Sequence, residues 1–90
     1  IVQEALTNAI KHSHASHIEI SSSRIDGEEG ETTLCLTVSD DGTGLPKKLQ
    51  KRGLGLRIMR NRAAMADAEL TIQSSEEGTT VNVLLKEKHA

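Results

Sequence analysis

The sequence predicts an α+β fold, a two-layer sandwich with two helices on one face of a mixed, largely antiparallel sheet. The predicted order of elements is helix, strand, strand, glycine-rich loop, helix, strand, strand, and runs of paired strands beside helices are typical of α+β domains. A short acidic turn joins the first two strands, which indicates an antiparallel hairpin. Ninety residues, of which 36% are apolar, are enough for one small domain with a thin core.

The first helix is predicted over residues 1 to about 13. An advance of about 100° per residue gathers its apolar side chains on one side: Val2, Leu6, Ala9 and Ile10. Glu4, Asn8 and Lys11 gather on the opposite side, with His12 at the edge. Spacing alone favours a solvated face with a Glu-Lys pair, but asparagine is a mediocre helix former, so Asn8 invites a second explanation.

Two strands follow the first helix. Between residues 17 and 25, Ile18 and Ile20 alternate with polar residues, which predicts a half-buried strand. After the acidic turn at 26–31, an apolar series on one face marks the second strand: Leu34, Leu36 and Val38. Asp40 continues this series, so its carboxylate is expected to point toward the core side.

A buried carboxylate without a partner is costly, so Asp40 requires an explanation. In a structural interpretation, Asp40 caps the turn at Gly42 through the backbone, as aspartate often does before glycine. In a functional interpretation, Asp40 is a hydrogen-bond acceptor at the floor of a pocket, and Asp41 does the capping. The residues alone leave both interpretations open.

The second half of the chain predicts one helix and two further strands. From residue 56 onward, apolar or small residues recur at helical spacing: Leu56, Met59, Ala63 and Ala66. Arg57 and Arg60 face away from this side. Residues 75–78 form a turn between the last two strands. The alternating apolar residues are Leu70 and Ile72 in the first of these strands and Val81, Val83 and Leu85 in the second, where Thr79 shares their face.

Residues 40–56 predict a nucleotide-binding loop. Four glycines let a backbone approach a ligand closely: Gly42, Gly44, Gly53 and Gly55. Asp40 offers a hydrogen-bond acceptor, and the lysines at 47, 48 and 51 offer positive charge. The ligand is therefore expected to have a hydrogen-bond-donating end and an anionic end. The loop is not a P-loop, which needs G-x-x-x-x-G-K-S/T, nor a Rossmann turn, because Ile58 stands where the third glycine would be.

Composition narrows the range of functions. The chain has no aromatic residue on which bases could stack, and its net charge of −2 argues against bulk binding to DNA or an anionic membrane. The single cysteine, Cys35, fits a reducing compartment. No apolar run approaches the ~18 residues of a membrane span, and no signal peptide is visible. The histidines at 12, 14 and 17 match no zinc spacing, so metal binding by His14 or His17 is not expected.

Three stretches resemble the sequence boxes of a known superfamily. QEALTNAIKH at 3–12 resembles the N box, DDGTGLP at 40–46 resembles the first glycine box, and RGLGLRIMRNRA at 52–63 resembles the second. In this order they look like the ATP-binding domain of the gyrase, Hsp90, histidine kinase and MutL superfamily, which has the Bergerat-type ATP-binding fold. Three features resemble the nitrate-sensor branch of the sensor histidine kinases: the motif E-A-L-T-N-A-x-K-H, a very short lid and the tail EGTTVNVLL.

The resemblance implies a role for each matching residue at the adenine end of a bound ATP. Asp40 would accept a hydrogen bond from the adenine amino group. Gly42 and Gly44 would let the backbone approach the base, and Thr79 would support the adenine end.

At the phosphate end, the resemblance implies that Asn8 gives its amide oxygen to Mg²⁺, which prefers a few protein oxygens beside phosphates and water. The other ATP-binding residues expected at this end are Lys11, His12, Gly53, Gly55 and Leu56. Gly53 and Gly55 would open the second helix, whose N-terminal amides favour anions, and residues 45–52 would form a short lid. Glu4 would be the catalytic residue, which orients or deprotonates a water in related ATPases and helps the acceptor histidine in the kinases.

The implied function is transfer of the γ-phosphoryl group of ATP, with Mg²⁺, to a histidine on a separate dimerisation domain that this chain lacks. Catalysis would consist mainly of positioning and charge neutralisation. A response regulator would be the partner of that dimerisation domain. The chain itself is expected to be a monomeric cytoplasmic domain of a bacterial sensor, for example a membrane-bound one, without direct contact to membrane or nucleic acid.

Residues 1–90 are expected to be a single, N-terminally truncated catalytic domain. Ile1 enters the helical pattern without a capping residue before it, and the family usually has a strand and a helix before the N box. We therefore expect this fragment to bind ATP poorly, and to be weakly active or inactive, until the missing part is supplied.

Three alternatives stay open. The first is another ATPase of the superfamily or an anti-sigma-factor kinase, against which the Lys11-His12 ending and the short lid argue. The second is a regulatory module that binds nucleotide without catalysis, against which the intact Glu4, Asn8 and Asp40 count. The third is a plain structural domain, which leaves the inward Asp40 and both glycine boxes unexplained.

Overall fold

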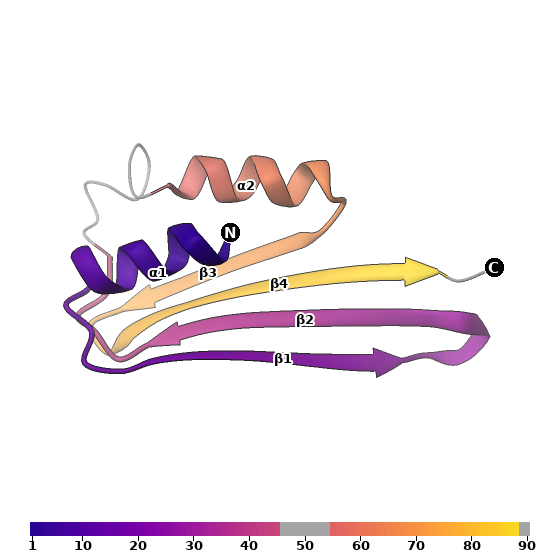
Figure 1. Cartoon of the computed structure of the whole chain (residues 1–90), viewed down its shortest axis with the longest axis horizontal. Coiled ribbons are helices and arrows are strands. Elements are labelled where there is room, and N and C mark those ends of the chain that lie inside the picture. The colour runs from indigo at the N-terminus through magenta and orange to yellow at the C-terminus, as the bar shows by residue number, and fades with distance from the viewer. Residues whose placement is uncertain (46–54, 89–90) are drawn as a thin grey trace.

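The computed structural model describes residues 1–45 and 55–88 of the chain. Within them the elements follow the predicted order (Figure 1). The helices are α1 (Val2–Lys11) and α2 (Leu56–Met65), the strands are β1 (Ile18–Asp26), β2 (Glu31–Asp40), β3 (Glu69–Ser75) and β4 (Gly78–Lys88), and a short 3-10 helix, η1 (Glu28–Gly30), connects β1 to β2. The two helices and four strands that the sequence predicts are therefore confirmed.

The strands form one sheet in the order β1-β2-β4-β3. β1 and β2 form the predicted hairpin, with Ile20 opposite Val38. After α2 the chain enters the other edge of the sheet as β3 and returns as β4, which places Val81 opposite both Ile72 and Val38. The predicted α+β sandwich is confirmed. The sequence predicts a mixed, largely antiparallel sheet, whereas all the described pairings are antiparallel, because short connections join β1 to β2 and β3 to β4, and β4 also runs opposite to β2.

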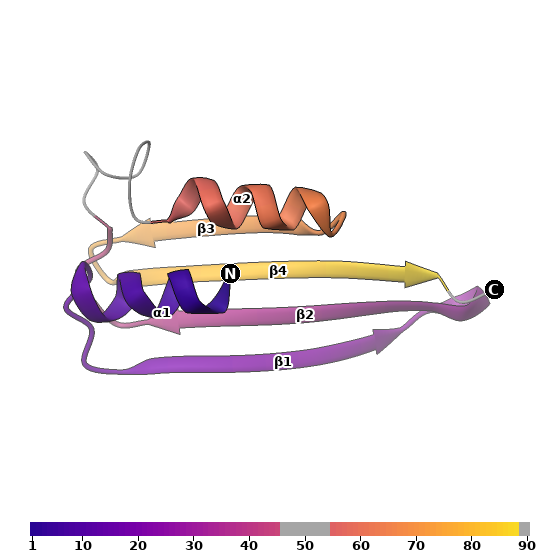
Figure 2. The same ribbon diagram turned by 45° about the horizontal axis from the view of Figure 1, so that its top comes forward.

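Both helices lie on the same face of the sheet (Figures 1 and 2). Alternation along the strands turns Val38 and Val81 toward the helices, where they pack with the other buried core residues: Ala5, Leu45, Leu56 and Met59. The opposite face is polar, and there Oγ1 of Thr37 donates a 2.7 Å hydrogen bond to Oδ1 of Asn82. The sheet thus has one core face and one solvent face, as antiparallel sheets often do.

Helix α1 is rotated relative to the predicted apolar pattern. Its buried residues are Ala5, Asn8 and Ala9, while Ile10, which the pattern places inside, is 64% exposed. The buried arc is turned by about a quarter of a turn toward the polar stripe, at about 100° per residue. The reason is that α1 packs on the sheet and on α2 together, and the periodicity of α1 carries no information about where α2 lies.

Strand β1 is more exposed than its alternating pattern predicts. Ile18 packs against the core, but Ile20, on the same face, is 49% exposed, and every later residue of the strand is exposed. β1 is an edge strand, and both helices lie over the end of the sheet where β1 begins (Figure 1). The prediction of a half-buried strand is therefore wrong for most of β1, because no helix covers its second half.

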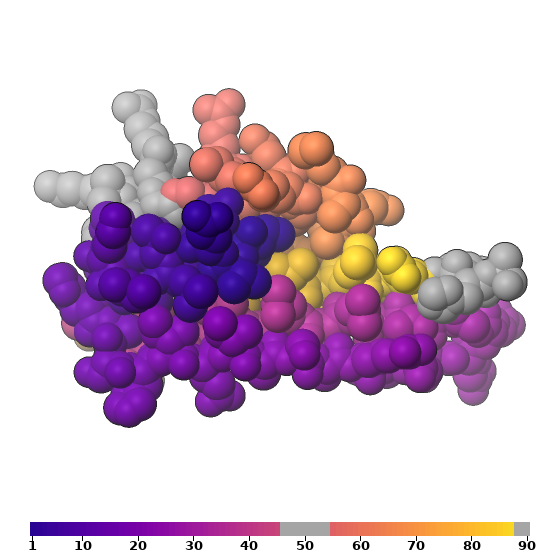
Figure 3. Space-filling model, viewed as in Figure 1, coloured from indigo at the N-terminus to yellow at the C-terminus, as the bar shows by residue number. Residues whose placement is uncertain are grey.

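The far half of the helix-facing side is open. A hollow of about 570 Å³ there has a mainly apolar lining from β2 and β4, including Leu34, Leu36, Val83 and Leu85. Figure 3 shows atoms of β2 and β4 at the surface beyond the ends of the two helices. Each helix has 10 residues and is ~15 Å long, whereas the molecule extends over 43 Å. Neither helix, and no other within the described residues, is long and apolar enough to cross a membrane.

Candidate nucleotide-binding site

Asp40, the last residue of β2, lies on the helix-facing side and caps its own turn. Its cross-strand partner is Thr79, on the same face. The Gly42 N–H donates a 2.9 Å hydrogen bond to Oδ1 of Asp40, so the structural interpretation of this residue is confirmed. The bond uses one carboxylate oxygen, and a carboxylate can accept at both. Capping by Asp40 is therefore compatible with recognition of a ligand.

Asp41 has a different role from the predicted one. Its Oδ1 accepts hydrogen bonds from the backbone N–H groups of Ser16 at 2.8 Å and His17 at 2.9 Å, and its Oδ2 lies 3.1 Å from Nδ1 of His17. These contacts, of which the His17 N–H is the strongest, lower the pKa of the Asp41 carboxyl. Asp41 thus holds the loop before β1 in place, whereas Asp40 caps the turn at Gly42. The partners of Asp41 lie 24 and 25 residues away, beyond the reach of local turn rules.

The fold itself requires two glycines of the first glycine box. A Cβ atom at Gly42 would clash with the carbonyl oxygen of Ser13, at the end of the first helical segment. Gly44 has a φ of +84°, which favours glycine, and a Cβ atom there would clash with the carbonyl oxygen of Ser75. The glycine box is therefore held between the end of α1 and the turn that joins β3 to β4. Its predicted approach to adenine stays a prediction.

Ser74 belongs to this end of the site, and sequence reasoning missed it. Its Oγ accepts a 2.7 Å hydrogen bond from the Leu45 N–H and lies 2.9 Å from Oγ1 of the buried Thr79. Ser74 stands directly opposite Thr79 in the pairing of β3 with β4. The turn predicted at 75–78 indicates this contact, because residues that flank a tight hairpin turn face each other across the two strands.

A second group of predicted residues meets between α1 and α2, although its members come from both halves of the sequence. Glu4, Asn8, His12 and Gly55 line one hollow of about 430 Å³, which Gln3, Thr7, Ile58 and Arg62 complete. Asn8 is 5% exposed and the side chain of Glu4 is 16% exposed. The interpretation of the polar stripe as a purely solvated face is therefore wrong for Glu4 and Asn8.

Gly55 brings the start of α2 close to α1. Its φ of +68° is in the left-handed region that favours glycine. A Cβ atom at Gly55 would lie 3.0 Å from Cγ of Glu4, so the Glu4 side chain packs against the residue before α2. The first N–H groups of a helix have no partner within the helix and favour anions. The start of α2 is therefore suited to a phosphate on this side of the hollow.

Glu4 has a cationic neighbour on α2. Its Oε1 lies 3.6 Å from Nε of Arg62. The pKa of the Glu4 carboxyl is lowered, first by a hydrogen bond from its own backbone N–H and with smaller effect by Arg62, against an opposing effect of burial. Sequence reasoning missed Arg62: it borders the buried stripe of α2, but helical periodicity does not say on which side α1 lies.

Several predicted residues lie elsewhere. Lys11 is exposed at the end of α1. Leu56 is 3% exposed and belongs to the core, so its predicted contact with ATP is limited to its backbone. Leu45, predicted as the first lid residue, is also buried in the core. Gly53 and the rest of the predicted lid, 46–52, lie outside the described residues.

The Mg²⁺ prediction depends on Asn8. Within residues 1–45 and 55–88, no three His, Cys, Asp or Glu side chains come together as a metal site. A Mg²⁺ ion that binds with ATP needs only one or two protein oxygens, because phosphates and water supply the others. The Asn8 amide, on the wall of the hollow, fits that requirement.

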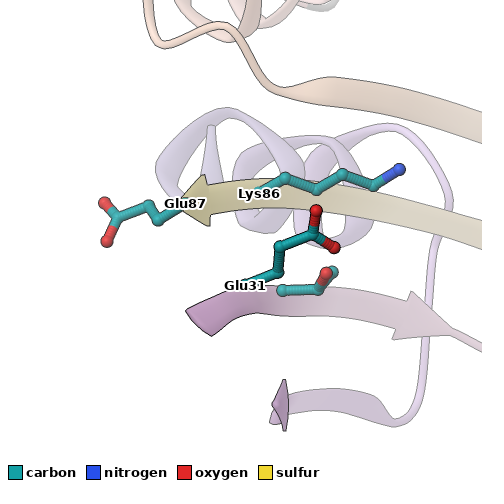
Figure 4. A pocket seen from close by; sticks show the side chains of 4 residues that line it. Glu31, Lys86 and Glu87 are labelled. Atoms are coloured by element: carbon teal, nitrogen blue, oxygen red, sulfur yellow. The ribbon is translucent and has the colours of Figure 1, made fainter. Parts of the chain in front are cut away.

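A further hollow lies at the far end of the sheet. It has a volume of about 370 Å³ and is lined by Glu31, Thr33, Lys86 and Glu87 of β2 and β4. In Figure 4 the side chains of Glu31 and Lys86 lie on the same side of the strands, whereas Glu87 points away. None of the predicted ATP-binding residues lines this hollow and its charges are of both signs, so we assign no ligand to it.

The fold and the two residue groups define the class of protein. An Asp-x-Gly-x-Gly turn ends a strand, and beside the glycine-led start of a helix lies a hollow with asparagine and glutamate on its wall. This is the arrangement of an ATP-binding domain. Residues 1–89 match the family described as histidine kinase-, DNA gyrase B- and HSP90-like ATPases, and the chain belongs to this family.

Sensor kinases are among the similar characterised proteins. The chain is 36% identical over 89 residues to the signal transduction histidine-protein kinase/phosphatase UhpB of Salmonella typhimurium, a match that covers 99% of the chain and 17% of that protein. It is 47% identical over 81 residues to the sensor protein NarQ homolog of Haemophilus influenzae, with coverage of 89% and 14%. The chain therefore spans less than a fifth of the length of these two relatives.

Solved structures of histidine kinases have the same fold. The histidine kinase domain of the blue-light activated histidine kinase EL346 of Erythrobacter litoralis matches with a TM-score of 0.75 at 35% identity, over 93% of this chain and 43% of that chain. The histidine kinase AdeS of Acinetobacter baumannii shares the fold, with a TM-score of 0.68 at 22% identity over 93% of this chain and 44% of that one. The predicted resemblance to the ATP-binding domain of histidine kinases is therefore confirmed.

Proposed function

We propose that this chain is the ATP-binding catalytic domain of a two-component sensor histidine kinase. The observation that carries the proposal is the meeting of Glu4, Asn8, His12 and Gly55 in one hollow beside the start of α2. The similarity to sensor kinases over almost the whole chain supports it. The reaction is transfer of the γ-phosphoryl group of ATP to a histidine on a dimerisation domain elsewhere in the parent protein.

At the adenine end, Asp40 accepts a hydrogen bond from the adenine amino group with Oδ2, because Oδ1 already binds the Gly42 N–H. Thr79, which Ser74 contacts at 2.9 Å, supports this end of the site. Gly42 and Gly44 let the backbone of the glycine box approach the base. The glycine box packs against the end of α1, and α1 also lines the hollow between the helices, which supports one ligand that reaches both groups of residues.

At the phosphate end, the ATP-binding residues in this proposal are Asn8, Lys11, His12, Gly53, Gly55 and the backbone of Leu56. Mg²⁺, when it is bound through the Asn8 amide oxygen, neutralises phosphate charge. Glu4 is ionised at neutral pH, since its pKa is lowered, and it orients the nucleophile or takes a proton from it. The contribution of the chain is mainly positioning of reactants.

The parent protein in this proposal is a bacterial sensor, and this chain is its cytoplasmic catalytic domain. The dimerisation domain of the parent is the direct partner of the chain, and a response regulator receives the phosphoryl group from that domain.

The test of this proposal uses the full-length parent protein and ATP that carries ³²P in its γ-phosphate. We expect an acid-labile, base-stable label on a histidine outside residues 1–90. Asn8→Ala should abolish the labelling and the effect of Mg²⁺ on ATP affinity. Asn61→Ala, on the exposed side of α2, is the matched control and should leave both unchanged. An acid-stable label, or free phosphate without labelled protein, would contradict the kinase and favour a simple ATPase of the same family.

A further inference from the structure

Helix α2 brings a cation, Arg62, to the Glu4 carboxylate. Nε of Arg62 lies 3.6 Å from Oε1 of Glu4, and both residues line the hollow between the helices. On another side, Gly55 packs against the Glu4 methylene groups, with 3.0 Å between Cγ of Glu4 and a Cβ atom built at Gly55. Helix α2 therefore limits the position of Glu4 at two places, the residue before its first turn and a residue in its last turn.

The two ends of this ion pair are in different surroundings. The Glu4 side chain is 16% exposed, whereas the Arg62 side chain is 66% exposed. An ion pair with one end in water adds little to the free energy of folding, because solvent screens it. Arg62 also makes the smallest of the contributions that lower the Glu4 pKa. The contact therefore matters chiefly for where the Glu4 carboxylate lies, since Nε of Arg62 is 3.6 Å from Oε1 of Glu4.

Arg60 and Arg57 of the same helix have other positions. Both are exposed, and Arg60 stands about 200° away from Arg62 around the helix. Arg62 directly precedes Ala63, which is buried, so it borders the side of α2 that packs on the rest of the protein. Arg60 is therefore a matched control for Arg62, with the same side chain on the same helix.

We propose that Arg62 is a positioning residue for Glu4. It holds the carboxylate in the hollow, in the orientation that phosphoryl transfer needs, and so links α2 to the catalytic group on α1. This inference rests on the proposed function, in which Glu4 orients or deprotonates the nucleophile. Arg62 itself exchanges no proton and binds no phosphate in this role. Loss of Arg62 therefore slows the chemical step and leaves ATP binding intact.

The experiment compares Arg62→Gln with Arg60→Gln in the full-length protein, by initial rates of autophosphorylation at several ATP concentrations and pH values. We expect Arg62→Gln to lower kcat about tenfold, which is less than the roughly 10²- to 10⁴-fold that a general acid–base group itself contributes, with little change in the KM for ATP. Because Glu4 loses a neighbouring positive charge, the acid limb of the rate profile should move to higher pH. Arg62→Lys should recover part of both effects, and Arg60→Gln should match the wild type.

A double-mutant cycle with Glu4→Gln separates positioning of Glu4 from any other role of Arg62. In the Glu4→Gln background, Arg62→Gln should have no further effect on kcat. A persistent effect there would overturn the inference. A higher KM for ATP at unchanged kcat would also overturn it, because it would place Arg62 on the nucleotide. If Arg62→Gln fails to fold, Arg62→Lys and its pH profile decide the question in the same way.

Different experimental results would overturn this inference and the proposed function. An acid-labile label in the wild type, together with an Arg62→Gln variant as fast as the wild type, overturns only the role of Arg62. Absence of label in the wild type overturns the proposed kinase function and the inference with it.

Discussion

Asp40 and Asp41 are neighbours with different tasks. Asp40 binds the Gly42 N–H on the helix-facing side, whereas Asp41 binds the loop before β1 through Ser16 and His17. Consecutive side chains at the end of a strand point to opposite faces, so the two carboxylates cannot share a role. Asparagine at either position keeps an acceptor oxygen, so this substitution tests charge and recognition more than turn geometry.

We expect Asp40→Asn to weaken ATP binding about 10- to 100-fold, which is the cost of losing a hydrogen bond to a charged acceptor. The amide oxygen still accepts from the Gly42 N–H, so the free energy of unfolding should change little. Calorimetric titration of the full-length protein with ATP measures the first effect, and urea unfolding measures the second. Asp67→Asn, at an exposed residue after α2, controls for the lost charge. An unchanged Kd in Asp40→Asn would contradict the adenine role.

Asp41 is expected to make stability depend on pH in the acid range. Its pKa is lowered in the folded state, chiefly by the His17 N–H, so folding favours the ionised carboxylate. The stability that it adds is present above the pKa of an unfolded aspartate, about 3.9, and is lost as the pH falls through the lower folded pKa.

Asp41→Asn should therefore be less stable than the wild type at neutral pH. The difference should shrink as the pH falls below the pKa of an unfolded aspartate, because the carboxyl then becomes protonated in the folded as well as in the unfolded protein. Urea unfolding midpoints of both proteins from pH 7 to the acid range, with Asp67→Asn as the control for charge, measure this difference. A constant difference at all pH values would show that the charge of Asp41 has no part in its contacts.

Helices α1 and α2 build the hollow together, and each supplies what the other lacks. Helix α1 provides the side-chain oxygens of Glu4 and Asn8, while α2 provides its N-terminal amides and Arg62. Their separation depends on Gly55, where a left-handed backbone and a missing side chain allow the start of α2 to approach Glu4. A side chain at this one position should therefore affect both the fold and the reaction.

We expect Gly55→Ala to destabilise the protein by ~1–2 kcal/mol, because an L-residue in the left-handed region is strained. It should also lower the rate of phosphoryl transfer, because the new Cβ atom must displace Glu4. Gly27→Ala is the matched control: its φ is −92° and its Cβ atom would lie 3.5 Å from the nearest side-chain atom, so stability should stay the same or rise slightly. Equal unfolding midpoints for the two variants in urea would contradict this account of Gly55.

Seen as a whole, the molecule has a sheet that is longer than its helical layer. The two helices lie over one end, and the apolar residues at the other end of the helix-facing side are open, so that Leu34 is 40% exposed. Apolar patches of this kind mark places where another segment or protein packs. We expect residues of the parent protein outside 1–90 to cover the open half.

A chain extended by the parent's own residues before Ile1 should unfold at a higher urea concentration than residues 1–90 alone. Its m value should also be larger, because unfolding exposes more surface. An extension of the same length made of glycine and serine is the control, since it adds chain without apolar surface. Equal midpoints and m values for the two extended chains would show that the open half of the sheet is not the place where the parent's residues pack.

Local patterns were enough to predict most of the fold and part of the site. Alternation placed Val38, Val81 and Asp40 on one face, and the structure has them there. Helical spacing identified the buried stripe of α2 at Leu56, Met59 and Ala63. The three boxes led to the ATPase family. These predictions succeed because they depend on the period of a strand or helix and on turn chemistry, which neighbouring residues determine.

Only the tertiary structure decided how the elements meet. It turned α1 so that Asn8 is buried and Ile10 is exposed, it gave Asp41 its partners across the chain, and it placed Arg62 beside Glu4. It also left most of β1 uncovered. Each of these depends on packing between segments far apart in the sequence, and the period of a single element carries no information about the direction from which its neighbour approaches.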